Sequence, residues 1–386
     1  MVSKNNSLKT KNRKFENFLS QYRDRKIYTF GELLLRILSL IALLYIFMLS
    51  ITMMGSAFKL FGKGFANQLI ATTSNPFVGL VIGILATSIV QSSSTTTSIV
   101  VGLVGVNVLS IGNAIPIVMG ANIGTSVTNT LVSLGHISRS DEFERAFSAS
   151  TVHDFFNLIA VLVIFPIQYY TNILGISSDF LAGTFQNIGG LKAVSPIKMI
   201  TEPVVTIITD ISGQSGIIVL IISLLLLFIT LRYLVKVLKS LIIGKLEKFF
   251  DRIIFRNAFI SLMFGVIITS LVQSSSITTS LIVPLVGAGI LTIEQIFPYT
   301  LGANIGTTVT AMLAAMATGN IAAITVAFAH FSFNIFGTIL IFPIRSVPIN
   351  MAKWMSKLSL KSKIYPILYI VLVFFLFPFL TIYFLR

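Results

Sequence analysis

The chain has 386 residues, of which 55% are hydrophobic and 11% charged, and its mean hydropathy is +0.92. This composition excludes a soluble globular domain, and apolar stretches of about 20 residues match the ~30 Å hydrocarbon core of a bilayer. The absence of cysteine excludes disulfides and thiolate metal sites, and the formal net charge of +15 lies in loops beside apolar stretches, which argues against a nucleic-acid partner.

In chain order, the charge pattern divides the sequence. Residues 1–32 carry eight Lys/Arg against three acids, 232–256 carry seven against two, and 345–363 carry five against none. Basic loops remain on the cytoplasmic side. The sequence therefore predicts a basic cytoplasmic segment (1–32), a first repeat (33–171), an extracellular connector (172–213), a second repeat (214–345), and a C-terminal cytoplasmic loop with a final transmembrane or interfacial helix (346–386).

Apolar stretches long enough to cross a bilayer are predicted near 33–57, 113–135, 144–171, 214–240, 294–316, 319–345 and 364–385. Two further apolar segments, about 77–106 and 258–288, are each interrupted by a polar block. The half that precedes the first block has 14 residues, or about 21 Å as a helix, which is too short to cross. We therefore expect two re-entrant helical hairpins, whose polar tips must be buried in protein or face water.

The two halves of the chain repeat each other. Gln91 pairs with Gln273 and Gly120 with Gly302 at an offset of 182 residues, whereas His153 pairs with His330 at 177. Each unit reads span, hairpin, span, span, so it crosses three times. Because three is odd, the second unit is inverted relative to the first, which is the architecture of alternating-access transporters. The predicted fold is an all-α polytopic membrane protein with two inverted-topology repeats.

Each hairpin tip combines backbone N–H groups at a helix start with several hydroxyls, a combination that suits an oxyanion such as phosphate or sulfate. The alternative is that these Ser and Thr side chains bond back to the preceding helical turn. Three serines follow Gln in both copies, and all but one of the next three residues in each copy are threonines, the exception being Ile277. This repeated polar block favours the anion site. The candidates are Gln91, Ser92, Ser93, Ser94 and Thr95 of the first tip and Ser274, Ser275 and Ser276 of the second.

A second repeated motif, which begins Gly-Ala-Asn-Ile-Gly-Thr, covers residues 120–128 and 302–310. Two glycines around an Asn weaken a helix, so an unwound transmembrane helix with free carbonyls is predicted in each repeat. Such oxygens suit Na⁺. Close helix packing of the Gly-xxx-Gly type is the alternative. The candidate ligands in these segments are Asn122, Thr125, Thr128 and Asn304.

Asp154 breaks the symmetry, because its partner in the second repeat is Phe331. An acid within an apolar span is a functional candidate, here as a cation ligand or as a charge that sets the transport stoichiometry. The alternative is a structural Asp near the membrane edge, either neutral or paired with His153. His153 and His330 are interpreted as hydrogen-bond donors in helix packing, not as metal ligands.

The segments QSSSTTTSIVV, EFERAF, TVHDFFN and LGANIGTTVTAMLAA resemble the type II sodium-dependent phosphate cotransporters over about residues 35–345. The resemblance implies that the serines and threonines of both QSSS blocks contact phosphate. It also implies that Asp154 corresponds to the acid of electrogenic members. The sodium ligands that it implies are Gln273, Thr307 and Thr310 for one ion and Thr130 and Asn157 for another.

Three positions depart from the family pattern: His136 replaces a Gln, Arg139 an Asp, and Ala303 a Ser. The sequence nonetheless predicts sodium-coupled symport of inorganic phosphate into the cell by alternating access. We expect Na⁺ to be the only metal ion that the protein binds and membrane lipid to surround it. We expect neither a cofactor nor an enzymatic activity. We expect a multi-pass protein of the cell inner membrane with a cytoplasmic N-terminus. Another oxyanion, proton coupling and an anion channel are the alternatives, and a homodimer is left open.

Overall fold

The computed structural model describes residues 30–135, 137–138, 140–187, 190–249, 255 and 257–385. These residues are almost entirely helical, and no β-strand occurs among them, so the predicted all-α class is confirmed for this part of the chain. Most of the basic segment 1–32 lies outside the described residues, as do His136 and Arg139.

The helices follow one another with short connections. Their bounds are α2 (Phe30–Thr72), α3 (Pro76–Val90), α4 (Ser93–Gly105), α5 (Ile111–Thr125), α6 (Val127–Leu134), α7 (Ser140–Thr171), α8 (Ile173–Asn187), α9 (Gly190–Ile211), α10 (Gly216–Phe249), α11 (Ala258–Val272), α12 (Ser275–Ser280), α13 (Val283–Gly287), α14 (Ile293–Thr318), α15 (Ile321–Ile341), α16 (Ser346–Lys361), α17 (Ile364–Val371), the π-helical turn η2 (Leu372–Leu376) and α18 (Phe377–Leu385). The connector predicted over 172–213 is thus largely helical, in α8 and α9.

Six helices in the described part of the chain are long and apolar enough to cross a bilayer. Six of the seven spans that the sequence predicts have a counterpart among these helices. The helical segments Gly64–Thr72 and Pro76–Val90 meet at a bend of 98°. They would add a seventh span if the two together form one broken span. The six are Gly31–Gly62, Ser140–Thr171, Gly216–Leu234, Ile293–Thr318, Ile321–Ile341 and Ile364–Leu385.

The span predicted over 113–135 is instead two helices, α5 and α6, which meet at Ser126. The hydroxyl of Ser126 donates to the carbonyl of Ile123 at 2.8 Å, and its backbone N–H donates to the same oxygen at 3.3 Å. Because the N–H bonds a carbonyl three residues back, the regular α-helical pattern ends there. The two pieces, 15 and 8 residues long, are each too short to span a bilayer.

The prediction of an unwound transmembrane helix is wrong for 302–310, because α14 runs without a break from Ile293 to Thr318. In 120–128 the backbone is helical except at Ser126, where α5 ends and after which α6 begins. The glycines serve close packing between helices, because a methyl group at Gly120 would overlap the Leu80 carbonyl of α3. Gly302 makes the same approach to α11. The alternative interpretation of these glycines, close helix packing, therefore explains their positions.

Alanine at Gly120 is expected to destabilise the protein by about 3 kcal/mol or more, because the added carbon meets backbone and not a flexible side chain. The apparent melting temperature in detergent should fall by about 4 °C or more. Gly112, on the same helix, has no atom within 4 Å of an added Cβ, so Gly112→Ala is the matched control. An unchanged melting temperature for Gly120→Ala would contradict this account of the helix pair.

The two polar blocks form helix breaks of the same shape. Gln91 has φ 55° and ψ 29°, in the left-handed region, and Gln273 has 56° and 27°. The residues that follow, Ser92 and Ser274, are extended and begin α4 and α12. A non-glycine residue in the left-handed region is uncommon, and such positions gather at functional sites. Each block therefore turns the chain from one short apolar helix into the next.

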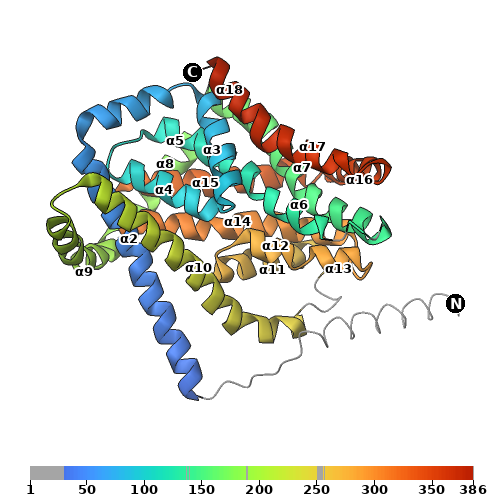
Figure 1. Cartoon of the computed structure of the whole chain (residues 1–386), viewed down its shortest axis with the longest axis horizontal. Helices are drawn as coiled ribbons and strands as arrows, with labels where there is room; N and C mark the ends of the chain where they lie inside the picture. The colour runs from blue at the N-terminus through green and yellow to red at the C-terminus, as the bar shows by residue number, and fades with distance from the viewer. Residues whose placement is uncertain are drawn as a thin grey trace, which may run out of the picture.

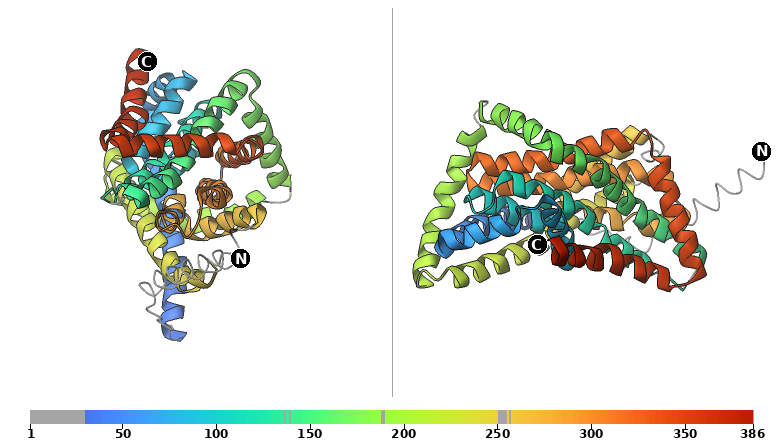
Figure 2. Two further views of the ribbon diagram at one scale, coloured as in Figure 1. Left: turned by 90° about the vertical axis from the view of Figure 1, so that its right-hand side faces the viewer. Right: turned by 90° about the horizontal axis from the view of Figure 1, so that it is seen from above.

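Helix α14 crosses the middle of the molecule, and α4, α12 and α15 pack against it (Figure 1). α2 packs against α10 and also against α4 and α14, whereas α16 to α18 lie along the outside of the bundle in both views of Figure 2. Two apolar clusters flank the centre. One contains Phe147 and Phe156 of α7, and the other contains Phe47 of α2 and Val104 of α4. Many polar side chains are buried as well, including those of Asn122, Asp154 and Asn304.

Candidate functional site

The tips of the two helix breaks touch each other. The hydroxyl of Ser94 donates to the backbone carbonyl of Gln273 at 3.2 Å, although the two residues are 179 positions apart. Gln273 is 9% exposed, whereas the side chain of Gln91 is solvent-accessible. The side chains of Ser93, Ser94 and Thr95 in the first tip and of Ser275 and Ser276 in the second are buried. The structure thus brings the two predicted tips together.

Some of the tip hydroxyls are engaged locally. Ser92 accepts the backbone N–H of Thr95 at 3.2 Å and caps α4, and Ser274 caps α12 in the same way. Thr97 bonds back to the carbonyl of Ser93, as the alternative interpretation of these side chains requires. In the described part of the chain, by contrast, the hydroxyls of Ser93, Ser275 and Ser276 have no hydrogen-bond partner. These three side chains are the ones free to bind a ligand.

Asn129 connects the first half of the chain to the second tip. Its amide donates to the hydroxyl of Thr279 at 2.7 Å, and its carbonyl oxygen accepts from Ser280 at 2.9 Å. The sequence analysis did not identify Asn129 as a site residue. The only signal was its place in a Thr-Asn-Thr run, and that run does not reveal partners 150 residues away.

The two histidines each bond an Asn from the other half of the chain. His153 Nε2 lies 2.6 Å from Asn304 Oδ1, and His330 Nε2 lies 3.4 Å from Asn122 Oδ1. The amide of Asn304 donates to Asn157 Oδ1 at 2.7 Å, so Asn304 Oδ1 is an acceptor and His153 Nε2 carries the proton. The interpretation of both histidines as hydrogen-bonding partners in helix packing agrees with this geometry. Among the described residues, no three His, Asp or Glu side chains are grouped together.

The predicted sodium ligands fall into two groups. The hydroxyls of Thr125 and Thr307 donate to carbonyls of their own helices, at 2.9 and 3.0 Å. The hydroxyls of Thr128 and Thr310 are buried and have no hydrogen-bond partner in the described part of the structure. Buried polar groups normally have hydrogen-bond partners. Of these four threonines, Thr128 and Thr310 therefore have the hydroxyl oxygens that suit an ion. They occupy equivalent positions in the two halves, 182 residues apart.

Asp154 is fully buried in α7. Its Oδ2 atom accepts hydrogen bonds from the hydroxyl of Thr130 at 3.0 Å and from that of Tyr369 at 3.2 Å. Its Oδ1 atom has no partner among the described residues. The alternative of an Asp paired with His153 is not what the geometry shows, because the hydrogen bonds of His153 go to Asn304 and Asn129. Tyr369 is a second site residue that the sequence analysis missed.

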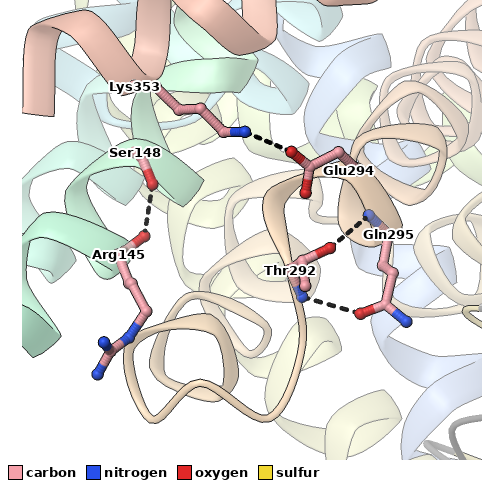
Figure 3. A network of polar contacts seen from close by, with 6 residues as sticks. All are labelled: Arg145, Ser148, Thr292, Glu294, Gln295 and Lys353. Atoms are coloured by element: carbon pink, nitrogen blue, oxygen red, sulfur yellow. Dashed lines mark hydrogen bonds and ion pairs between the residues drawn. The ribbon is translucent and has the colours of Figure 1, made fainter.

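The far ends of both tip segments are held by side chains from the opposite half. Arg145 of α7 donates to the carbonyl of Gly287 at 2.8 Å, and Asn320, before α15, donates to that of Gly105 at 2.8 Å. Nearby, Lys353 of α16 pairs with Glu294 at the start of α14, where Thr292 and Gln295 form a capping box (Figure 3). These contacts fix the elements that carry the tips.

Comparison with known proteins gives a consistent result. The family model described as Na+/Pi-cotransporter matches residues 46–181 and 226–346. The sodium-dependent phosphate transport protein 2B of Homo sapiens is 34% identical, over 93% of this chain and 66% of the relative. Protein 2B of Pongo abelii is 34% identical, over 90% and 65%, and protein 2A of Ovis aries is 35% identical, over 92% and 68%.

The chain therefore spans about two thirds of the length of these relatives. No solved structure matches it. The family model matches both halves of the chain, including the two tips and the two Gly-Ala-Asn-Ile-Gly segments. The resemblance to the sodium-dependent phosphate cotransporters that the sequence motifs indicate is therefore confirmed. The chain belongs to the Na+/Pi-cotransporter family.

Proposed function

We propose that this protein imports inorganic phosphate by symport with sodium ions, and that phosphate binds between the two QSSS tips. The observation that supports the proposal is the contact between Ser94 and Gln273, because it joins two segments that are far apart in sequence. The names of the relatives, sodium-dependent phosphate transport proteins, support the same substrate and the same coupling ion.

The chemistry of the tips suits an anion that carries several acceptor oxygens. The unpartnered hydroxyls of Ser93, Ser275 and Ser276 donate hydrogen bonds, and the first turn of α4 adds backbone N–H groups and the positive end of its dipole. Neither tip contains Lys or Arg. The tips thus offer phosphate neutral donors, most of them buried.

Sodium ions supply the missing charge in this proposal. A buried dianion is costly unless cations lie close to it, so the anion binds weakly until sodium is present. The oxygens available for sodium are the hydroxyls of Thr128 and Thr310 and Asp154 Oδ1, which are buried and unpartnered in the described structure. Gln273, Thr130 and Asn157 remain ligand candidates on the basis of the family resemblance. This dependence of anion binding on cation binding is the physical basis of coupling.

The proposed transport cycle is alternating access by two inverted repeats, each with a re-entrant hairpin. The matching dihedral angles at Gln91 and Gln273 support a repeated unit, as do the paired bonds of His153 and His330 to the opposite half. In this topology the N-terminus is cytoplasmic, and the basic loops face the same side. Rocking of one unit against the other would expose the tips to each side in turn.

Uptake of radiolabelled phosphate by proteoliposomes that contain the full chain tests the proposal. An inward sodium gradient should raise the initial rate about tenfold or more over a choline gradient, because the anion depends on the cation. Equal rates in sodium and choline would overturn sodium coupling, and a pH gradient in choline tests proton coupling directly. Competition by arsenate but not by sulfate is expected. Single-channel currents in planar bilayers would instead indicate an anion channel.

A further inference from the structure

The carboxylate of Asp154 is held through one of its two oxygens. Oδ2 accepts from Thr130 of α6 and from Tyr369 of α17, while Oδ1 is buried without a partner in the described structure. Two donors on one oxygen fix the plane and the direction of the carboxylate. Both donors are neutral hydroxyls, so the negative charge is oriented but not cancelled by them.

Tyr369 is itself fixed by packing. Its ring lies 6.0 Å from that of Phe155 of α7, centroid to centroid, and 5.9 Å from that of Phe374 in an edge-to-face arrangement. Tyr369 and Phe374 are 9% and 0% exposed. These contacts hold the ring of Tyr369 beside that of Phe155, so its hydroxyl has a defined position at Asp154.

A π-helical turn, η2, begins three residues after Tyr369. In η2 the N–H of Phe377 donates to the carbonyl of Leu372, five residues back, instead of four. Such turns are rare and are frequently found at functional sites. Phe374, whose ring packs against that of Tyr369, lies within this turn.

We propose that Tyr369 is a positioning residue for the ion site, which holds Asp154 so that Oδ1 faces the bound cation. The inference rests on the proposed function, in which Asp154 binds one of the transported sodium ions. It assigns a role to the C-terminal helix, which lies beyond the matched segments 46–181 and 226–346. Tyr369 acts through Asp154 and makes no contact with phosphate in this account.

The test is Tyr369→Phe, which removes one hydroxyl and keeps both ring contacts. The sodium concentration for half-maximal phosphate uptake should rise about tenfold, as expected for the loss of a hydrogen bond to a charged group. The phosphate concentration for half-maximal uptake, measured at saturating sodium, should be the same as in the wild type. Tyr365→Phe is the matched control, because Tyr365 lies one turn earlier on the same helix and is 36% exposed. A purely structural role predicts that Tyr369→Phe behaves as the wild type.

A double-mutant cycle with Asp154→Asn separates this inference from the proposed function. In the Asp154→Asn background, Tyr369→Phe should cause no further rise in the sodium requirement. An equal rise in both backgrounds would overturn the positioning role alone. If neither Asp154→Asn nor Tyr369→Phe changes the sodium requirement, the sodium site at Asp154 fails, and the positioning role with it.

The increase in melting temperature that sodium chloride causes relative to choline chloride gives a second measurement, independent of transport. It should be smaller in Tyr369→Phe than in the wild type and in Tyr365→Phe. The melting temperature in choline chloride alone checks that each variant is folded. Full sodium stabilisation of folded Tyr369→Phe would overturn the inference.

Discussion

Alanine at Gln273 is expected to reduce sodium-driven phosphate uptake at subsaturating concentrations by tenfold to a hundredfold. The side chain is 9% exposed and lies at the point where the two tips touch. Loss of a hydrogen-bonding group from a site for charged ligands costs about 1.5–3 kcal/mol, which corresponds to this range in binding. Gln91→Ala should also impair uptake severely, since Gln91 occupies the equivalent place in the first tip.

The control for this prediction must separate the side chain from the backbone. Both tip glutamines have positive φ, so replacement by alanine could act through strain alone. Gln214 also has φ 56°, but it lies in an exposed turn between α9 and α10. Gln214→Ala should therefore retain wild-type uptake. Wild-type uptake by correctly folded Gln273→Ala and Gln91→Ala would remove the tips from the substrate site.

Asp154→Gly is expected to retain phosphate uptake and to change the charge moved in each cycle. Removal of the carboxylate removes the negative charge that binds one cation, so the charge carried per phosphate should decrease by about one elementary charge. The ratio of integrated current to labelled phosphate uptake, at a fixed membrane potential, measures this directly. Asp154→Asn, which keeps an acceptor for Thr130 and Tyr369, should give the same change with less effect on folding.

Asp210→Gly is the matched control, since Asp210 is an exposed acid near the end of α9. Its ratio of charge to phosphate should equal that of the wild type. An unchanged ratio in Asp154→Gly would refute the role of Asp154 as the charge that sets stoichiometry. Loss of all uptake in both Asp154 variants would make this acid essential and would contradict the prediction in a different way.

The tip segments were the most predictable part of the molecule. A polar block between two apolar segments of about 14 residues can only be a break, because each piece is too short to cross and the block is costly in lipid. The structure places the left-handed residues at Gln91 and Gln273, where the two blocks begin. What the sequence could not provide was the partner of each tip, since the contact between Ser94 and Gln273 joins separate halves.

The glycine motifs were misinterpreted for a physical reason. Glycine both weakens a helix and permits another helix to approach, and sequence spacing does not distinguish the two effects. The deciding observation is the position of the neighbouring backbone, Leu80 beside Gly120 and Leu262 beside Gly302. Ser126, in contrast, ends α5 through bonds to Ile123 that any helical serine could in principle make.

Tyr369 marks the limit of sequence reasoning at this site. It lies in an apolar helix with no motif, and 215 residues separate it from Asp154. A hydropathy pattern assigns such a residue to lipid or to the core, and only the tertiary fold brings its hydroxyl to a carboxylate. Asp154 itself was identifiable because an acid in an apolar helix stands out wherever its partners lie.

The glycine contacts also limit how this molecule can deform. Gly83 of α3 meets the carbonyl of Ile117, and Gly120 of α5 meets that of Leu80, so the two backbones interlock in both directions. Gly265 and Gly302 join α11 to α14 in the same reciprocal way. Helices engaged at the level of the main chain cannot slide along each other without separating first. We therefore expect each helix pair to move as a rigid unit. Bending is then confined to places where the backbones are not interlocked, such as the turn at Ser126.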